Sequence, residues 1–402
     1  MPASAPMAVP LVDFAPVARL MLLAAVVALL PLGWWWLRQR GADRRGRAAA
    51  LTLLTLFLTF DLVVFGSFTR LTDSGLGCPD WPGCYGQTSP IGAAGHIGAA
   101  EAAMPTGPVT HTKAWIEMIH RYLAMTVGVL ILAMAAEAWT ERWRGEAMPV
   151  SPWWPTATLV WVVLQGLAGK YTVTLQLYPA VVTLHLLGGL TGLVLLAAQH
   201  TAYRPRPLVL PAPLSRWILP CALLLLAQIL LGGWVSTNYA VLACPDFPRC
   251  HAQWWPPMDW HAGFEVLRPL GQGSTGSLLP FDALVAIHMA HRLFAIVAVL
   301  ALLALAAAML RAARAGATAG TADATSVRRF GLAIGGVALV QVGTGLSNIV
   351  LGWPLAAALL HSAGAAALTL LLALAWLRSR RPGAAAARVA EGPVAAVELI
   401  RK

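Results

Sequence analysis

The stretch of sequence that decides the fold covers residues 115–138 and reads WIEMIHRYLAMTVGVLILAMAAEA. From Tyr122 to Ala138 it is almost wholly apolar, and with its lead-in it is long enough to cross a bilayer as a helix. Just before this run, Glu117 and His120 are three residues apart, so on a helix they share one face and lie about 4.5 Å apart along the axis. Ionisable groups are costly at membrane depth, and this pair is therefore a functional-site hypothesis that needs a partner elsewhere in the chain.

The whole chain has the composition of a membrane protein. Of its 402 residues, 58% are hydrophobic and only 11% are charged, with a mean hydropathy of +0.69. Several runs exceed the roughly 18 apolar residues that mark a membrane span. The net charge of +11 comes with arginines clustered in short loops between these runs. That clustering is typical of membrane topology and argues against a nucleic-acid partner.

Nine apolar runs predict nine membrane spans. Each should be a helix, because lipid offers the backbone no other hydrogen-bonding partner. The predicted spans are residues 16–37, 48–69, 118–138, 156–174, 179–199, 214–236, 284–310, 330–351 and 355–377.

The basic residues predict the orientation of these spans. Counted alternately, five connections or tails are rich in arginine and should face the cytoplasm, which puts the N-terminus outside and the C-terminus inside. These arginines are Arg38, Arg40, Arg44, Arg45, Arg47, Arg142, Arg144, Arg204, Arg206, Arg311, Arg314, Arg328, Arg329, Arg378, Arg380 and Arg381. Two long connections, 70–117 and 237–283, then face outward, and long loops usually carry function.

The chain contains an internal repeat. GLGCPDWPGC at 75–84 matches VLACPDFPRC at 241–250, and both cysteines recur at an offset of 166 (244 − 78 and 250 − 84). Further matches are His120-Arg121 with His291-Arg292, Gln165 and Gly169 with Gln341 and Gly345, and His185 with His361. Two parallel four-helix units, related by an axis along the membrane normal, would explain this pattern.

The predicted fold class is an all-α polytopic membrane protein with two pseudo-symmetric four-helix transmembrane bundles plus one extra N-terminal helix. The predicted division is 1–47 for the extra helix and its basic loop, 48–200 for the N-terminal half, 201–380 for the C-terminal half and 381–402 for a cytoplasmic tail.

Four histidines stand at repeat-equivalent positions near the outward ends of their helices: His120 and His185 in one half, His291 and His361 in the other. Two neutral imidazoles facing each other inside a helix bundle are the usual axial ligands of a haem iron. A lone buried histidine is more often a core residue with a hydrogen-bond partner, but four paired twice favour ligation. Zinc fits less well, since each pair lacks a third and fourth protein ligand.

Arginines follow the first histidine of each pair. Arg121 and Arg292 are candidates for charge-assisted contacts to haem propionates, and the alternative is that they extend to the membrane interface.

Cysteines form two spaced pairs in the outward loops, Cys78 with Cys84 and Cys244 with Cys250. The oxidising compartment favours a disulfide within each loop, and the alternative is a reactive dithiol that carries electrons.

The halves differ at Glu117, whose counterpart is His288 (288 − 117 = 291 − 120 = 171). Copies that diverge at one titratable residue suggest a division of labour, with catalysis where the acid remains. The alternative is that Glu117 only orients His120 or meets interfacial water.

Together these motifs resemble the haem A synthase family, over about residues 50–377. The resemblance rests on TRLTDSGLGCPDWPGC at 69–84, EMIHR at 117–121, HMAHR at 288–292, and the histidines at 185 and 361. The family oxidises the C8 methyl of haem O to the formyl group of haem A by successive hydroxylations. The predicted first span lies outside the family's eight-helix pattern.

The resemblance implies roles for particular residues. His291 and His361 would hold a haem b cofactor, while His120 and His185 would flank the iron of the haem O substrate, with Glu117 as the essential acid. Cys78–Cys84 and Cys244–Cys250 would be disulfide bonds. The implied partners are haem O, membrane lipid, an external electron donor and the haem O-forming enzyme, and the implied location is the bacterial inner membrane.

Three other functions are compatible with parts of the pattern. A dihaem cytochrome b would pass electrons without catalysis, a quinone-linked thiol oxidoreductase would use the outward cysteines, and a transporter built of parallel repeats would need no haem. The paired histidines count against the last two.

Overall fold

The structure is a computed structural model that describes residues 15–273, 276–318 and 323–380, and the predicted tail 381–402 lies outside these ranges. In the described ranges the chain is helical, with no β-strand longer than an isolated bridge. The long helices are α1 (Ala15–Arg38), α2 (Arg44–Leu71), α4 (His111–Trp143), α5 (Trp153–Thr174), α6 (Pro179–Tyr203), α7 (Ala212–Thr237), α9 (Phe281–Thr318), α10 (Ala324–Val350) and α11 (Leu355–Ser379). Short helices in the loops are α3 (Ala94–Ala103), η1 (Ala240–Leu242) and α8 (Trp260–Gly263). The predicted all-α fold is confirmed.

Helix starts follow local capping chemistry. The Asp43 side chain accepts a hydrogen bond from the Gly46 amide at 3.0 Å, and Thr110 accepts one from Lys113 at 3.2 Å. These caps satisfy backbone N–H groups that have no partner within the helix. α4 therefore begins at His111, seven residues before the predicted span.

Eight of the described helices are long and apolar enough to cross a membrane, and α5 is the long helix that falls short. It has 22 residues, but Gln165, Lys170 and its threonines lower its mean hydropathy. The predicted fourth span, at 156–174, is thus present as a helix packed against α4 and α6, although its composition alone does not identify it as a membrane span.

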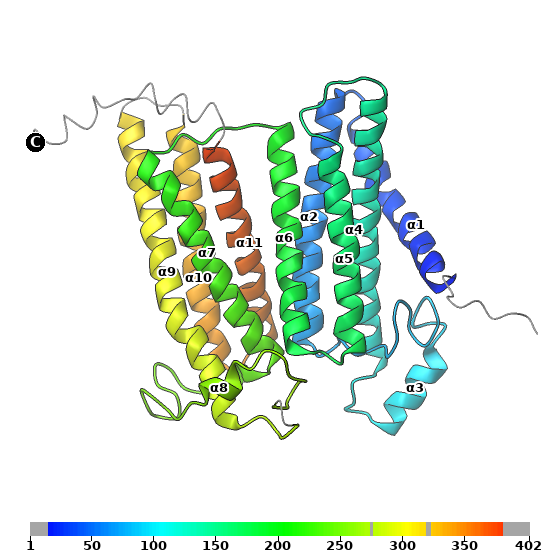
Figure 1. Cartoon of the computed structure of the whole chain (residues 1–402), viewed down its shortest axis with the longest axis vertical. Coiled ribbons are helices and arrows are strands. Elements are labelled where there is room, and N and C mark those ends of the chain that lie inside the picture. Colours follow the sequence, from blue (N-terminus) through cyan, green and yellow to red (C-terminus); the bar gives the residue numbers. More distant parts are fainter. Residues whose placement is uncertain (1–14, 274–275, 319–322, 381–402) are drawn as a thin grey trace, which may run out of the picture.

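Each half of the chain forms a closed ring of four helices (Figure 1). In the first, α2 contacts α4, α4 contacts α5, α5 contacts α6, and α6 returns to α2. In the second, α7, α9, α10 and α11 contact one another in the same cyclic order. Between the rings, α6 packs on α11, and the α2–α11 contact mirrors the α6–α7 contact. Helix contacts therefore follow the repeat found in the sequence.

The pseudo-twofold axis is also visible in single contacts. Arg70 donates a hydrogen bond to the carbonyl of Ser236, and Tyr239 donates one to Asp73 at 2.7 Å. Both pairs are separated by 166 residues, the offset of the repeat. Repeat-equivalent positions thus meet each other at the C-terminal ends of α2 and α7.

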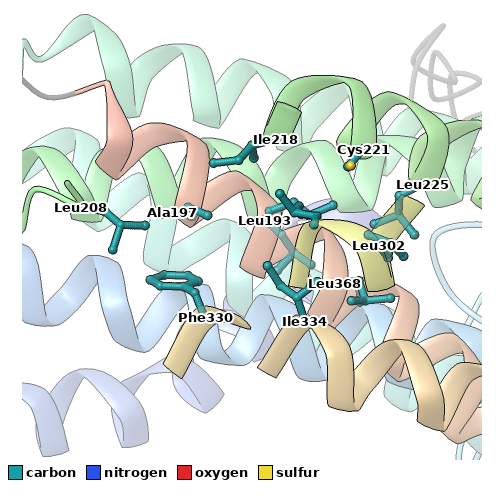
Figure 2. Packing of buried hydrophobic residues seen from close by; sticks show 14 of the residues in the cluster. Leu193, Ala197, Leu208, Ile218, Cys221, Leu225, Leu302, Phe330, Ile334 and Leu368 are labelled. Atoms are coloured by element: carbon teal, nitrogen blue, oxygen red, sulfur yellow. The ribbon is translucent and has the colours of Figure 1, made fainter. Parts of the chain in front are cut away.

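One apolar core joins the two rings. Its largest cluster includes buried residues of α2, α4, α6, α7, α9, α10 and α11. Figure 2 shows its centre, where Leu193 of α6 lies among Leu225, Leu302, Ile334 and Leu368 from the second ring. Close packing of these side chains holds the two halves in a fixed relation.

The extra helix α1 lies outside the first ring, against α4 (Figure 1). Leu20, Ala24 and Ala28 are fully or almost fully buried and are spaced four residues apart. This spacing makes one narrow packing face, and the remaining surface of the helix is largely exposed.

Candidate functional site

The N-terminal histidine pair faces the interior of the first ring. His120 lies on α4 and His185 on α6. Each imidazole packs against a glycine of a neighbouring helix. A Cβ atom added to Gly66 of α2 would lie 2.9 Å from Nε2 of His120, and one added to Gly169 of α5 would lie 3.4 Å from Cε1 of His185.

The C-terminal pair repeats this arrangement. His291 lies on α9 and His361 on α11. A Cβ atom added to Gly232 of α7 would lie 2.9 Å from Cε1 of His291, and one added to Gly345 of α10 would lie 3.3 Å from Cε1 of His361.

The four glycines belong to the repeat as firmly as the histidines do. Gly66 and Gly232 differ by 166, and Gly169 and Gly345 by 176, which are the offsets of the surrounding motifs. At Gly66 and Gly232 an added methyl carbon would come within 3.0 Å of the imidazole, so the histidine would have to move; at Gly345 the contact would be tight, and at Gly169 it would be an ordinary van der Waals contact. Gly66 and Gly232 were not identified from the sequence, although their spacing from the cysteine motifs would have revealed them.

Two histidines in each half suit the two axial positions of a haem iron better than the four protein ligands of a structural zinc site. Each ring of helices presents two half-buried imidazoles, and each imidazole is backed by a residue without a side chain. Within the described ranges no three His, Cys, Asp or Glu side chains converge in the way that a structural zinc site requires. Ligation of haem iron by His120, His185, His291 and His361, two in each half, stays a prediction.

Glu117 points towards the cysteine loop. Its side chain is only 3% exposed, and it accepts a hydrogen bond from the amide of Cys78 at 2.8 Å. It also forms an ion pair with Arg121, one turn further along α4. A buried carboxylate requires such partners, because an unpaired charge in this position would be strongly destabilising. Glu117 thus joins the turn of α4 that contains His120 to the loop that contains Cys78.

Both candidate propionate ligands have protein partners. Arg121 donates to the carbonyls of Asp80, Pro82 and Gly83, and Arg292 donates to those of Cys244 at 2.8 Å and Arg249 at 3.0 Å. In this arrangement the two guanidinium groups fix the cysteine loops to α4 and α9. Contact with a propionate remains a prediction for both.

His288 takes the place of Glu117 in the second half. It is 4% exposed, and its Nδ1 lies 2.8 Å from the carbonyl oxygen of Ala240, so the ring donates a hydrogen bond where Glu117 accepts one. His288 therefore faces the connection that follows α7, while His291, three residues later, packs on Gly232.

The cysteine pairs are disulfide bonds. Cys78–Cys84 has a Cα–Cα distance of 4.9 Å and Cys244–Cys250 one of 4.8 Å, and all four side chains are fully buried. These bonds agree with the structural alternative and leave no exposed thiol for a dithiol reaction among these cysteines. Cys221, the remaining cysteine, is free and buried in the core (Figure 2).

An aspartate organises each disulfide loop. Asp80 accepts from the amides of Tyr85 at 2.6 Å and Gly86 at 2.7 Å. Asp246 accepts from Ala252 at 2.9 Å and His251 at 2.7 Å. Backbone donation, first from Ala252 and then from His251, lowers the pKa of the Asp246 carboxyl. Hydrogen bonds to the charged form are one of the three causes of such a shift.

Two closed rings of four helices, each with a histidine pair packed against glycines, define a multi-pass membrane protein whose duplicated histidine pairs are candidate haem ligands. Residues 49–374 match a family model described as cytochrome oxidase assembly protein. Since this match covers most of the chain, the protein belongs to that family.

Named relatives agree with this assignment. The chain is 35% identical over 326 residues to a protein of Shewanella oneidensis named heme A synthase, covering 80% of this chain and 93% of that one. It is 31% identical over 382 residues to a heme A synthase of Methylorubrum extorquens, covering 87% and 91%. A heme A synthase of Halalkalibacterium halodurans is 26% identical over 229 residues, covering 55% and 69%.

Proposed function

We propose that this protein is a haem A synthase that oxidises the C8 methyl group of haem O to a formyl group. The observation that carries the proposal is the duplicated pair of histidines, each packed on a glycine at a repeat-related position. A protein that only anchored or assembled a complex would not need four such close contacts. Membership of the family and the names of its relatives support the same conclusion.

The two halves are proposed to hold different porphyrins. His291 and His361 hold haem b as a resident cofactor in residues 201–380, and His120 and His185 hold the haem O substrate in residues 48–200. Haem b, when bound, supplies redox chemistry that amino-acid side chains lack. The chain contributes the ligands, an apolar interior and the space above each glycine.

Glu117 is proposed to hold or move a proton at the outward edge of the substrate half. Its oxygens lie between the amide of Cys78 and the guanidinium of Arg121, three residues before a substrate ligand. A proton on this carboxyl would weaken the ion pair to Arg121. Proton movement at Glu117 would thereby be linked to the loop that covers the site.

Topology completes the proposal. The arginine-rich ends of the helices face the cytoplasm of a bacterial cell, the N-terminus faces outward, and the protein spans the inner membrane. The two disulfide loops then lie in the oxidising compartment, where such bonds persist. An external electron donor and the haem O-forming enzyme are the proposed partners.

The deciding experiment is pigment extraction and chromatography from cells that co-express the protein with a haem O-forming enzyme. Haem A and a hydroxylated intermediate should accumulate with the unaltered protein and be absent with His120→Ala. The matched control is His111→Ala, which alters an exposed histidine at the start of the same helix. Two bound haems of one type without haem A would identify an electron-transfer cytochrome b instead. Disulfide transfer that depended on Cys78 would identify a thiol oxidoreductase.

A further inference from the structure

His361 has a hydrogen-bond partner that determines which of its ring nitrogens carries the proton. Oγ1 of Thr344 lies 3.0 Å from Nδ1 of His361. The same hydroxyl donates its single proton to a backbone carbonyl, that of Val340 at 2.8 Å or Gln341 at 3.3 Å. Its oxygen is then only an acceptor towards the ring, so Nδ1 carries the imidazole proton. Nε2 is left with its lone pair, which is the state that binds a metal.

His291 is held by a side-chain amide. Nε2 of Gln228 lies 3.0 Å from Nδ1 and 3.3 Å from Nε2 of the His291 ring, and 3.2 Å from the His291 carbonyl oxygen. Oε1 of Gln228 is buried and has no partner among the described residues. The amide therefore offers both a donor and an acceptor beside Nδ1, and rotation about its last bond presents the acceptor. In either orientation Gln228 limits rotation of the ring.

The N-terminal half lacks both partners. The position equivalent to Thr344 is Ala168 (344 − 168 = 176), and the position equivalent to Gln228 is Leu62 (228 − 62 = 166). Neither side chain can form a hydrogen bond. Accordingly Nδ1 of His185 is buried and unpartnered within the described ranges. The two halves thus share ligands and glycines but differ in what supports the ligands.

We infer that Thr344 and Gln228 are positioning residues that make the C-terminal half the retaining haem site, while Ala168 and Leu62 make the N-terminal half the exchanging one. This inference rests on the proposed function, in which one porphyrin stays and the other enters as substrate and leaves as product. Partners of metal-ligating histidines fix the ring and its tautomer, and their loss costs roughly 10- to 100-fold in affinity. A site that must release its product each cycle gains from their absence.

The test measures haem b release from each half separately. Substituting His120 and His185 by alanine leaves only the C-terminal site, and substituting His291 and His361 leaves only the N-terminal site. Each purified protein is loaded with haem b, and transfer to excess apomyoglobin gives the release rate. Before transfer, the absorption and electron paramagnetic resonance spectra report whether two imidazoles ligate the iron.

In the C-terminal-only protein, Thr344→Val should speed haem release roughly 10- to 100-fold. Thr344→Ser, which keeps the hydroxyl, should restore the slow rate and the original spectrum. In the N-terminal-only protein, release should be faster than from the other half, and Ala168→Thr should slow it. A Thr344→Val protein that released haem at the unaltered rate, or an N-terminal half that released it more slowly than the C-terminal half, would overturn the inference.

A parallel measurement separates this inference from the proposed function. Haem A production by the unaltered protein tests the reaction, whereas release rates test the asymmetry of the two sites. Asymmetric release without haem A production would retain the positioning roles of Thr344 and Gln228 and reject the synthase assignment. Symmetric release with normal haem A production would do the reverse. Circular dichroism and gel filtration of every variant identify loss of folding.

Discussion

A methyl group added at Gly66 should impair haem binding by the first half of the protein while changing its folding stability little. In Gly66→Ala the new Cβ would lie 2.9 Å from Nε2 of His120. Non-bonded carbon and nitrogen atoms pack at roughly 3.5–4.0 Å, so the imidazole must retreat by about 0.6 Å or more. Functional groups in ligand sites tolerate displacements of only about 0.5 Å.

The same substitution should cost little folding free energy. Overpacking costs roughly 1–3 kcal/mol, but the atom in contact is at the end of a rotatable side chain. Replacing glycine inside a helix by alanine returns about 0.5–1 kcal/mol. The net change in the free energy of unfolding should therefore stay below about 2.5 kcal/mol, while the affinity of the first half for haem falls by about tenfold or more, as when a group that orients a metal ligand is lost.

The assay is a titration of the N-terminal-only protein with haem b, together with haem A output from the otherwise unaltered chain. The matched control is Gly128→Ala on α4, where a Cβ would meet nothing within 4 Å. That variant should bind haem normally and be slightly more stable. If Gly66→Ala and Gly128→Ala bound haem with equal affinity, the argument that glycine at position 66 makes room for His120 would be refuted.

Three further predictions follow from the loops and the acid. Glu117→Gln should keep haem b content but abolish haem A output, since the amide can accept from Cys78 but cannot exchange a proton; normal output would remove Glu117 from the chemistry. Substituting Cys78 and Cys84 together by serine should lower the free energy of unfolding by about 2 kcal/mol, the chain-entropy value for so short a loop, and an unchanged melting temperature would contradict this. The pKa of Asp246 is lowered by backbone donors, so its stabilisation of the loop is complete above the unfolded value of roughly 3.9 and is lost as pH falls through the lower folded value. Amide exchange in residues 246–252 should therefore rise below about pH 4, and Asp246→Asn should show no such pH dependence.

The sequence was sufficient to predict the helices and the repeat because both depend on patterns that lipid imposes. Hydropathy located the apolar helices, and constant offsets between the cysteine motifs related the halves. The weak point was α5, where Lys170 and Gln165 lower the hydropathy of a helix that packs within the first ring. The predicted span at 118–138 also begins later than helix α4, because hydropathy does not detect a helix cap such as Thr110.

The site was predictable only in part, for a different reason. Aligning the halves reveals what they share, and it identified the four histidines from identities between them. Thr344 and Gln228 were missed because they differ between the halves. The direction of a side chain is also invisible to helical spacing: Glu117 and Arg121 turn towards the cysteine loop, which no periodicity in α4 indicates.

The contacts of Arg70 with Ser236 and of Asp73 with Tyr239 carry a consequence for how the two sites came to differ. A twofold dimer of identical chains makes isologous contacts of this kind, in which a surface patch meets its own copy. In such a dimer every substitution enters both subunits at once. Joining the subunits through the segment between α6 and α7 encodes each position twice, so an acid can be kept at one copy and replaced by histidine at the other. Covalent fusion is thus what permits a symmetric scaffold to contain two unequal sites.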